Sequence, residues 1–588
     1  MIINQDTLNF LLYDVFQAEA LTELDAYKDH DRSTFDGVID TSLKIAQDYF
    51  LPHNAKADAN EPSFDGESVS TIPEVKEAWK HFTEAGLINA RHRFDEGGMQ
   101  LPALVHSACM GLFTGANPST AGYPFLTSAA SNLIHAFGSE TQKSLYLDGM
   151  FSGRFAGTMA LTEPNVGSSL GDLTTKATPQ DDGSYRLKGQ KMYISGGDQD
   201  ITENIIHLVL ARVEEAPQGV KGISLFICPK FLLNDDGSLG KRNDVMLAGL
   251  LHKMGYRGTT STVLNFGEKD DCTAFLIGEE GKGLSYMFKM MNEARIGVGL
   301  GAAMIGYRGY LESLAFAKDR PQGRKPSNRD TTSAPVNIVE HADVKRMLLA
   351  QKVYVEGSLA LCLFASKLVD EHEAGGDENA LVLLDLLTPV VKSYPSTYGC
   401  KANELAIQVL GGSGYIREYP VEQCYRDNRL NPIHEGTHGI QSLDLLGRKL
   451  WQKQGLGQQL LMQRVQATLA RVKKHERLAD LAEQYSTALK TFIETTTALG
   501  MALQQGRIDE ALANSALYLD VMGRMVVGWL WLDMACAALE SDRDEAFVSG
   551  KLQAARYFIR WELPEINHLS ELLKGFDQTC AEMEVDWF

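Results

Sequence analysis

The segment SYRLKGQKMYIS, residues 184–195, is the clearest strand signal in this chain of 588 residues. Further runs rich in β-branched and aromatic residues follow it at NIIHLVLARV (204–213), GISLFICPK (222–230) and STVLNF (261–266). Short runs of this kind, separated by Gly, Asp and Asn clusters, are typical of strands joined by turns. We therefore predict an antiparallel β domain over residues 154–279.

On both sides of this block, apolar residues recur at helical spacing. Helices are predicted at Pro73–Leu87 and Ser139–Met150 before it, and at Tyr286–Asp319, Ile338–Glu373 and Asn379–Leu410 after it. A chain of this length exceeds a single core. The expected fold class is α+β, with a helical N-terminal domain (1–153), the central antiparallel β domain (154–279), a helical bundle domain (280–455) and an extra C-terminal helical domain (456–588).

Composition argues against several classes of protein. The balance of 56 Lys and Arg against 76 Asp and Glu gives a net charge of -20, which would repel a nucleic-acid backbone. Eight cysteines without a C-x-x-C pair suggest neither a disulfide framework nor a thiolate metal site, and no metal is expected. The N-terminus lacks a basic leader and no apolar run approaches the length of a membrane span, so the prediction is a cytoplasmic protein.

Two glycine-rich strings imitate known motifs. Gly297-Val-Gly299-Leu-Gly301 resembles a dinucleotide-binding turn, but it lies inside a helical pattern with no preceding strand, so we predict a helix-packing seam. Gly167-Ser168-Ser169-Leu170-Gly171 matches the nucleophile elbow of hydrolases, yet strand-like sequence follows it instead of a helix. A serine hydrolase using Ser169 therefore remains a minor alternative.

The surrounding string MALTEPNVGSSLGDLTTKA, residues 159–177, predicts an irregular loop. Pro164 and Gly167 interrupt regular backbone, so the N–H groups near Thr162 and Ser168 are free to bond something other than a neighbouring strand. Such a loop suits a planar heteroaromatic ligand. A plain surface loop is the alternative.

The string YRDNRLNPIHEGT, residues 425–437, precedes an apolar-periodic helix, HGIQSLDLLGRKLW. Asn431-Pro432 predicts a turn, and Thr437 is a candidate helix cap. Taken alone, Glu435 could simply stabilise the helix dipole.

Together with KMYISGG (191–197) and QVLGGSGY (408–415), these strings resemble the acyl-CoA dehydrogenase family in the family's own order, over roughly residues 36–452. The resemblance implies an FAD cofactor. It places Thr162 and Ser195 at the pyrimidine edge and N5 region of the flavin and Tyr193 against the ring. Ser168 would lie near the CoA part of the acyl-CoA substrate.

The same resemblance implies that Glu435 is the catalytic base. Its backbone N–H and a flavin ribityl hydroxyl would bind the enolate oxygen, and Gly436 would allow the turn to present that amide to the substrate. Arg295 would lie near the CoA and the catalytic loop, although a helix-surface ion pair with Glu293 or a neighbouring acid is an alternative for it. The assigned cofactor site also includes Arg320, Gln322, Gln408, Gly411, Gly412 and Thr437.

In the family, the arginine corresponding to Arg320 and the segment corresponding to 408–415 serve the FAD of a neighbouring subunit, which implies at least a homodimer; the phenylalanine usual in the first of these motifs is missing here. The implied reaction is α,β-dehydrogenation of an acyl-CoA to the trans-2-enoyl-CoA, with electrons passed to an electron-transfer flavoprotein. An acyl-CoA oxidase is the main alternative. The C-terminal addition resembles the enlarged branch that includes very-long-chain and 3-methylthiopropanoyl-CoA dehydrogenases. A non-catalytic scaffold would be expected to have lost Glu435.

Overall fold

The computed structural model describes the backbone of residues 1–588 and all side chains except those of residues 288–292, which include Asn292. The chain divides into two compact units. The helical unit comprises Met1–Phe35, Pro102–Gly111 and Arg295–Phe588, and the sheet unit comprises Asp36–Leu101 and Leu112–Ala294. Three helices have residues in both units: α2 (Arg32–Ile45), α5 (Ala103–Ala116) and α8 (Gly283–Asp319).

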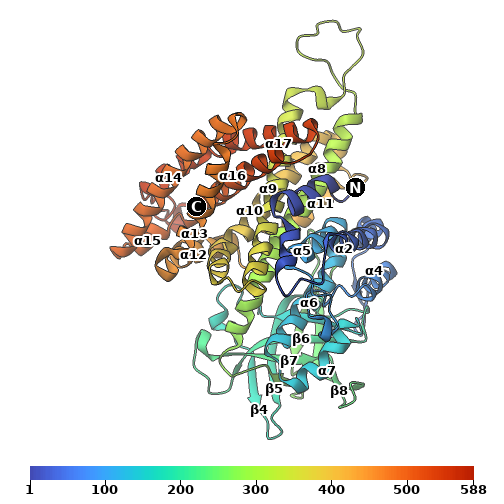
Figure 1. The fold of residues 1–588 in the computed structure, drawn as a ribbon. Coiled ribbons are helices and arrows are strands. Elements are labelled where there is room, and N and C mark those ends of the chain that lie inside the picture. Colours follow the sequence, from blue (N-terminus) through green and yellow to red (C-terminus); the bar gives the residue numbers. More distant parts are fainter. The chain divides into compact units, whose positions relative to one another are not determined.

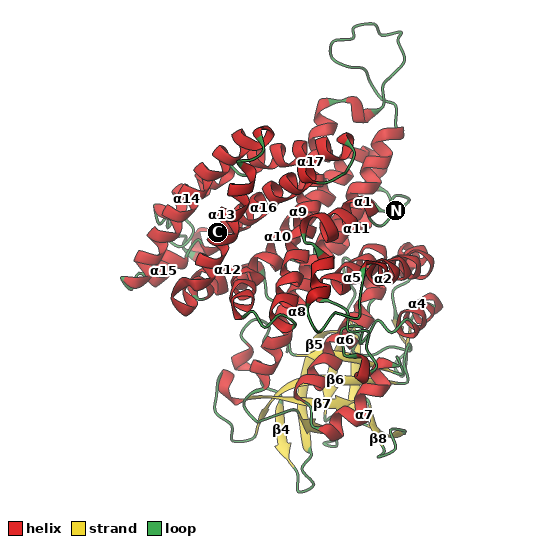
Figure 2. Ribbon diagram, viewed as in Figure 1, coloured by secondary structure: helices red, strands yellow, loops and turns green.

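An eight-stranded sheet forms the core of the sheet unit (Figure 2), in the order β10-β11-β5-β12-β7-β6-β3 with β4 paired to β5 and β6. All ten residues of β6 are buried, as expected for a strand covered on both faces. The strands are β3 (Phe155–Ala160), β4 (Lys176–Pro179), β5 (Tyr185–Ser195), β6 (Asn204–Val213), β7 (Ile223–Pro229), β10 (Val245–Leu250), β11 (Ser261–Phe266) and β12 (Thr273–Leu276), with a separate hairpin of β8 (Phe231–Leu233) and β9 (Leu239–Arg242).

The sheet corrects the prediction of a purely antiparallel domain. Most pairs are antiparallel, but β6 runs parallel to both β3 and β4. The chain crosses over between β3 and β6 through β4 and β5, and such a long connection permits parallel pairing. Sequence texture predicts where strands lie but not the direction in which they pair.

The remaining helices of the sheet unit begin where local signals predict. Pro73 occupies the first turn of α4, and Ser139 caps α7 through a capping box with Gln142. A short hairpin interrupts the segment expected to be wholly helical. These elements are α3 (Asn54–Ala59), β1 (Ser63–Phe64), β2 (Val69–Ser70), α4 (Pro73–Glu84), α6 (Pro118–Phe137) and α7 (Glu140–Phe151).

In the helical unit, α9, α10 and α16 pack against one another (Figure 1). Gly299 of α8 lies so close to α10 that an added Cβ would sit 2.1 Å from the carbonyl oxygen of Val391, which confirms the predicted seam at this glycine. The helices are α1 (Gln5–Asn9), α9 (Ala342–Glu373), α10 (Glu378–Leu410), α11 (Val421–Asn428), α12 (His438–Gly447), α13 (Leu456–Val472), α14 (Ala479–Gln504), α15 (Ile508–Leu512), α16 (Ser515–Glu540), α17 (Glu545–Tyr557) and α18 (Glu565–Lys574).

The prediction that no apolar run approaches the length of a membrane span was wrong for two of these helices. Windows of α9 and α16 reach a mean hydropathy of 1.4 and 1.3 with few charges, enough by length and composition to cross a membrane. However, 89% and 94% of those windows are buried inside the protein. Helices surrounded by other helices are apolar on every side, so packing in the bundle accounts for their composition.

The first 35 residues pack within the helical unit, which the sequence did not predict. Tyr27 donates to Asp370 Oδ1 of α9 at 2.8 Å, and Arg543 pairs with Asp14 at 2.7 Å. The buried Lys551 of α17 also pairs with Glu356 of α9 at 2.9 Å. The C-terminal helices therefore hold both the N-terminal segment and the bundle.

Candidate active site

Glu435 lies in the loop between α11 and α12, in the left-handed backbone region with φ +53°. A residue with a side chain adopts this conformation only where its surroundings hold it there. Two buried side chains do so: Gln441 Nε2 donates to the Glu435 carbonyl at 3.1 Å, and Lys392 Nζ donates to the Gly436 carbonyl at 2.8 Å. Thr437 Oγ1 accepts from the Ile440 amide at 3.3 Å, which confirms the predicted cap of α12.

A chain of hydrogen bonds between buried asparagine side chains supports the Glu435 loop as well. Asn428 Nδ2 donates to Asn403 Oδ1 at 2.8 Å, and Asn431 Nδ2 donates to Asn428 Oδ1 at 2.9 Å. A ring nitrogen of His434 then lies 3.0 Å from Asn431 Oδ1. Burial lowers the pKa of His434 to about 3, so the imidazole stays neutral. Because a half-satisfied buried network is costly, this chain fixes the path of the backbone into Glu435.

The carboxylate of Glu435 is half-buried, and this burial raises its pKa, while Arg295 and Lys392 act in the opposite direction. Burial also lowers the pKa of Lys392 to about 8. No described donor lies within hydrogen-bonding distance of the Glu435 carboxylate. Among the described residues, the Glu435 carboxylate therefore has two nearby cations that favour its charged form but no direct hydrogen-bond partner.

Arg295 is buried, and its Nη1 lies 3.5 Å from Asp444 Oδ2 of α12. Its Nε has no hydrogen-bond partner among the described atoms. Glu293, the partner considered in the alternative reading, pairs instead with Arg91 at 3.6 Å. Arg295 therefore belongs to the charge cluster around the Glu435 loop.

In the sheet unit, the strand β5 carries the predicted flavin contacts at an irregularity. Its register against β11 shifts beside Thr262, and Tyr193 adopts φ +61° with 63% of the side chain exposed. A bulge of this kind re-aims a side chain out of the sheet. The Ser195 side chain is exposed two residues later, at the end of the strand.

The loop bearing Thr162 is fixed to β5 by a buried ion pair. The Thr162 carbonyl accepts from the Met192 amide at 2.9 Å, and Lys191 Nζ lies 3.0 Å from Glu163 Oε1. Four further donors from Thr174 and Thr175 bond the same carboxylate at 2.6–3.0 Å. These contacts hold the pKa of Glu163 down to about 2 despite its burial. Ser168, farther along the loop, is exposed.

The residues of this face fit a flavin. Within the described part of the chain, the hydroxyls of Thr162 and Ser195 have no hydrogen-bond partner. The ring of Tyr193, which lies between these two residues in the sequence, is exposed. An exposed aromatic ring and free hydroxyls can bind a planar ring with polar edges. Ser169 is followed by a short 3-10 turn and then β4, so the helix that a hydrolase elbow needs is absent from this described segment.

The residues predicted to serve a neighbour's cofactor are all exposed and lie at helix ends in the helical unit. Arg320 and Gln322 follow the end of α8, and Gln408, Gly411 and Gly412 lie at the end of α10. The rings of Phe316 and Tyr419, 5.8 Å apart, bring these two segments together. Gln408 is 16 residues beyond Lys392 on α10, roughly 24 Å at 1.5 Å per residue, so this end is remote from the Glu435 loop of the same chain.

Sequence reasoning missed Lys392, Gln441 and the asparagine chain. A lysine inside the apolar run TPVVKSYP of α10 was a usable signal, because a lysine is rarely fully buried without a partner. Nothing local connects it to Glu435, which lies 43 residues farther along. For the asparagines, no sequence signal existed.

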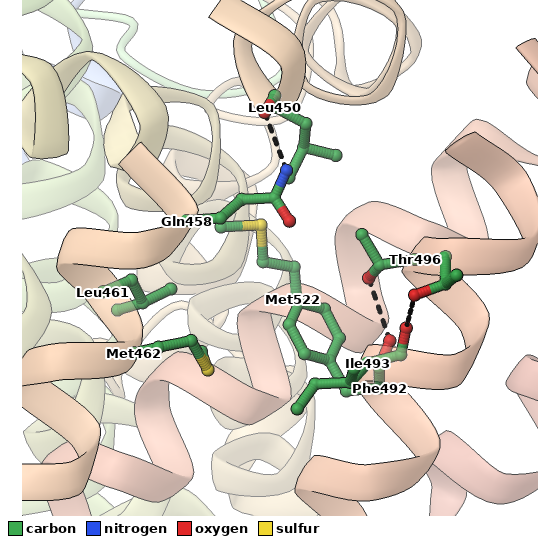
Figure 3. A pocket seen from close by; sticks show the side chains of 9 residues that line it. Leu450, Gln458, Leu461, Met462, Phe492, Ile493, Thr496 and Met522 are labelled. Atoms are coloured by element: carbon green, nitrogen blue, oxygen red, sulfur yellow. Dashed lines mark hydrogen bonds between the residues drawn. The ribbon is translucent and has the colours of Figure 1, made fainter. Parts of the chain in front are cut away.

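A cavity of about 80 Å³ lies between α13, α14 and α16 (Figure 3). The polar groups on its wall have partners in the protein: Gln458 Nε2 donates to the Leu450 carbonyl, and Thr496 Oγ1 donates to the Phe492 carbonyl. None of the predicted site residues lines it, so this cavity is separate from the Glu435 loop.

Four family models cover most of the chain: "Acyl-CoA dehydrogenase, N-terminal domain" at residues 37–154, "middle domain" at 158–268, "C-terminal domain" at 281–451, and "Acetyl-CoA dehydrogenase C-terminal like" at 461–584. The chain belongs to the acyl-CoA dehydrogenase family. It is an FAD-dependent oxidoreductase, as the resemblance implied.

Relatives extend over nearly the whole length. The chain is 36% identical to 3-methylmercaptopropionyl-CoA dehydrogenase of Ruegeria pomeroyi over 84% of each protein. It is 34% identical to a butyryl-CoA dehydrogenase of Syntrophomonas wolfei, covering 99% of this chain and 98% of the relative. It is 32% identical to the broad-specificity linear acyl-CoA dehydrogenase FadE5 of Mycobacterium tuberculosis, covering 98% and 97%.

Solved structures share the fold. The Caenorhabditis elegans protein ACDH-11, in complex with C11-CoA, superposes with a TM-score of 0.74 at 20% identity and covers 98% of this chain and 94% of that one. An acyl-CoA dehydrogenase from Bacillus anthracis, complexed with FAD, gives 0.74 at 20% identity, with coverage of 96% and 91%. Both extend through the C-terminal helical region, so the α+β fold with an added helical segment is confirmed.

Proposed function

We propose that this enzyme converts an acyl-CoA thioester to the trans-2-enoyl-CoA, with Glu435 removing the proton from the α carbon. The observation that carries the proposal is the state of that carboxylate: desolvated, without a direct hydrogen-bond partner among the described residues, and held in a left-handed turn. A raised pKa makes a carboxylate a stronger base once it is ionised. The acyl chain would complete this desolvation on binding.

Burial raises the pKa of Glu435, and Arg295 and Lys392 oppose that effect, so the two cations favour the ionised form of the base. The Glu435 N–H donates to no described backbone acceptor, which leaves it for the enolate oxygen of the substrate. The bound flavin would supply the acceptor for the hydride that leaves the β carbon. Thr162, Tyr193 and Ser195 would hold the ring, and Ser168 would lie toward the CoA.

For the substrate, we propose a linear acyl chain without a branch at the α carbon. The relatives' names support this, since they designate butyryl-CoA, linear acyl-CoA and the thioether 3-methylmercaptopropionyl-CoA. 3-Methylthiopropanoyl-CoA is the specific alternative. A panel of butanoyl-, 3-methylthiopropanoyl-, octanoyl-, palmitoyl- and isobutyryl-CoA, followed by flavin bleaching, distinguishes these substrates, and faster turnover of isobutyryl-CoA than of the linear chains would refute the proposal.

We further propose that electrons pass to an electron-transfer flavoprotein, with peroxide formation as the mark of the oxidase alternative. A homodimer is proposed because Arg320, Gln322, Gln408, Gly411 and Gly412 are all exposed at helix ends of the helical unit, where a second chain could reach them. The proposed compartment is the cytoplasm. Light scattering of the flavin-loaded protein tests the dimer. The segments 1–153, 154–279, 280–455 and 456–588 are proposed as its domains.

The direct test of the base is Glu435→Gln. The variant keeps the side chain's size but cannot accept a proton, so flavin reduction by acyl-CoA should slow about 10²–10⁴-fold, while the protein stays yellow and still binds the ligand. Glu422→Gln is the matched control, because Glu422 lies on α11, the helix that precedes the Glu435 loop, in an ion pair with Arg426 at 2.7 Å. Near-normal reduction by Glu435→Gln would refute the assignment.

A further inference from the structure

Two histidines and a glutamate form a compact cluster in the sheet unit, outside the proposed active site. One possible ligand atom from each of His92, Glu96 and His135 lies within 4.8 Å of those of the other two. His135 Nε2 is 3.1 Å from Glu96 Oε1, and the rings of His92 and His135 meet edge to face with centroids 4.4 Å apart. The cluster joins the segment after α4 to the helix α6.

His92 carries an unsatisfied nitrogen. The residue is 9% exposed, and its Nδ1 has no hydrogen-bond partner although the atom itself is buried. Its Nε2 lies 2.9 Å from Asn132 Oδ1 on α6. With the amide oxygen as acceptor, Nε2 carries the proton and Nδ1 presents a free lone pair. An outer residue that fixes the tautomer in this way is typical of histidines that bind metal.

The turn that carries His92 and Glu96 is closed by its own backbone hydrogen bonds. The Gly98 amide donates to Arg93 O at 2.9 Å and the Gln100 amide donates to His92 O at 2.8 Å. An added Cβ at Gly98 would lie 2.1 Å from that same His92 oxygen, so the turn needs glycine there. His92 and Glu96 therefore reach the cluster from a closed, well-bonded turn.

The two arginines beside the cluster in sequence, Arg91 and Arg93, are each paired with an acid. Arg93 is occupied by Asp95, with Nε 2.9 Å from Asp95 Oδ1, and Arg91 pairs with Glu293. The side chains of His135 and Glu96 are 37% and 34% exposed, which leaves a path from solvent.

We propose that His92, Glu96 and His135 bind a Zn²⁺ ion, with water in the remaining position. Two imidazoles and one carboxylate are a frequent zinc ligand set. Tetrahedral ligands at 2.0–2.1 Å from the ion lie about 3.3 Å from one another, close to the present spacing of His135 and Glu96. Binding would replace their hydrogen bond with one bond from each side chain to the ion. Glu96 and His135 are 39 residues apart, so spacing alone predicted no metal here.

The ion would clamp the turn at residues 92–100 to α6. Because α6 packs on β3, and β3 leads directly into the loop that carries Thr162, the site stabilises the scaffold of that loop. Nothing in this role depends on the acyl-CoA reaction.

The test uses the full-length, untagged, flavin-loaded protein, stripped with a chelator and titrated with Zn²⁺ by calorimetry, with the bound metal counted by mass spectrometry. One Zn²⁺ per chain and a higher thermal midpoint are expected. His135→Gln and Glu96→Gln should weaken binding at least tenfold, and Asn132→Ala about 10–100-fold through the loss of tautomer control.

The control is His252→Gln, which removes a histidine paired with Glu61 at 2.9 Å in the same unit but without a third ligand. It should leave Zn²⁺ affinity unchanged. No saturable binding by the wild-type protein, or equal losses in His252→Gln and His135→Gln, would overturn the proposal. Circular dichroism and flavin content verify that each variant is folded, and flavin reduction by acyl-CoA should be unaffected by the chelator.

Discussion

Glu163 in the sheet unit and Glu435 in the helical unit are both desolvated glutamates near a buried lysine, yet their pKa values move in opposite directions. Glu163 receives five hydrogen bonds, including one from Lys191, and its pKa falls to about 2. Glu435 receives none from the described residues at its carboxylate, and its pKa rises. The charge of Lys191 in direct contact with the carboxylate, together with the threonine donors, separates Glu163 from Glu435.

The difference separates a structural carboxylate from a reactive one. At Glu163 the protein satisfies the charge completely and thereby fixes the Thr162 loop. At Glu435 the same kinds of donor are directed elsewhere, since Lys392 and Gln441 bond the backbone carbonyls instead of the carboxylate. A base must keep its lone pairs for the substrate. Glu163 is therefore unsuitable as an inert control for Glu435.

The largest expected effect follows from removing the buried ion pair between Glu163 and Lys191. Glu163→Gln leaves Lys191 buried without its counter-charge, which should lower the free energy of unfolding by about 3–5 kcal/mol and release flavin. The measurement is urea unfolding at pH 7, followed by circular dichroism and flavin fluorescence. The double variant Glu163→Gln/Lys191→Met should recover part of this loss, because it removes the unpaired charge.

The same variant has a pH signature. A carboxyl with a lowered folded-state pKa contributes stability above its ordinary pKa of 4.5, and that stability is lost as pH falls toward 2. The wild-type protein should therefore lose part of its unfolding free energy over this window, and Glu163→Gln should lack that part. Identical acid profiles for the two proteins would contradict the assigned role.

A smaller effect is expected from removing a cation beside the reactive carboxylate. Lys392 favours the ionised form of Glu435, so Lys392→Met should raise the pKa of Glu435 and move the acid limb of flavin reduction to higher pH. Stopped-flow reduction rates between pH 5 and 9 measure the limb. Lys392→Arg should restore it.

Lys401→Met is the control for this shift, because Lys401 lies on the same helix and stacks on Tyr398 at 4.4 Å from the ring centroid. It should leave the acid limb in place. If Lys392→Met lowered the rate equally at every pH, Lys392 would act only through its bond to the Gly436 carbonyl.

The smallest expected effect concerns the cap of α12. Thr437→Ala removes the acceptor for the Ile440 amide and should cost about 1 kcal/mol of unfolding free energy, with Thr437→Ser restoring it. Flavin affinity, measured by fluorescence, reports on the second role proposed for Thr437. An unchanged affinity in Thr437→Ala would leave that residue as a cap alone.

Much of the fold could be predicted because its signals are local. The strand β5 coincides with the run at 184–195, and Pro73, Ser139 and Thr437 mark helix starts through the chemistry of their own side chains. The parallel pairing of β6 and the packing of the first 35 residues within the helical unit could not be predicted in this way. Both depend on contacts between segments far apart in the chain.

The sequence by itself determined the family, the cofactor and the turn around Glu435, because the ordered strings that carry them are contiguous. Tertiary structure alone decided the electrostatic state of that glutamate. Lys392, Arg295 and Gln441 come from three different helices, and a pKa depends on distance and burial in space, not on neighbours in the chain. For the same reason, only the folded chain brings His92, Glu96 and His135 together.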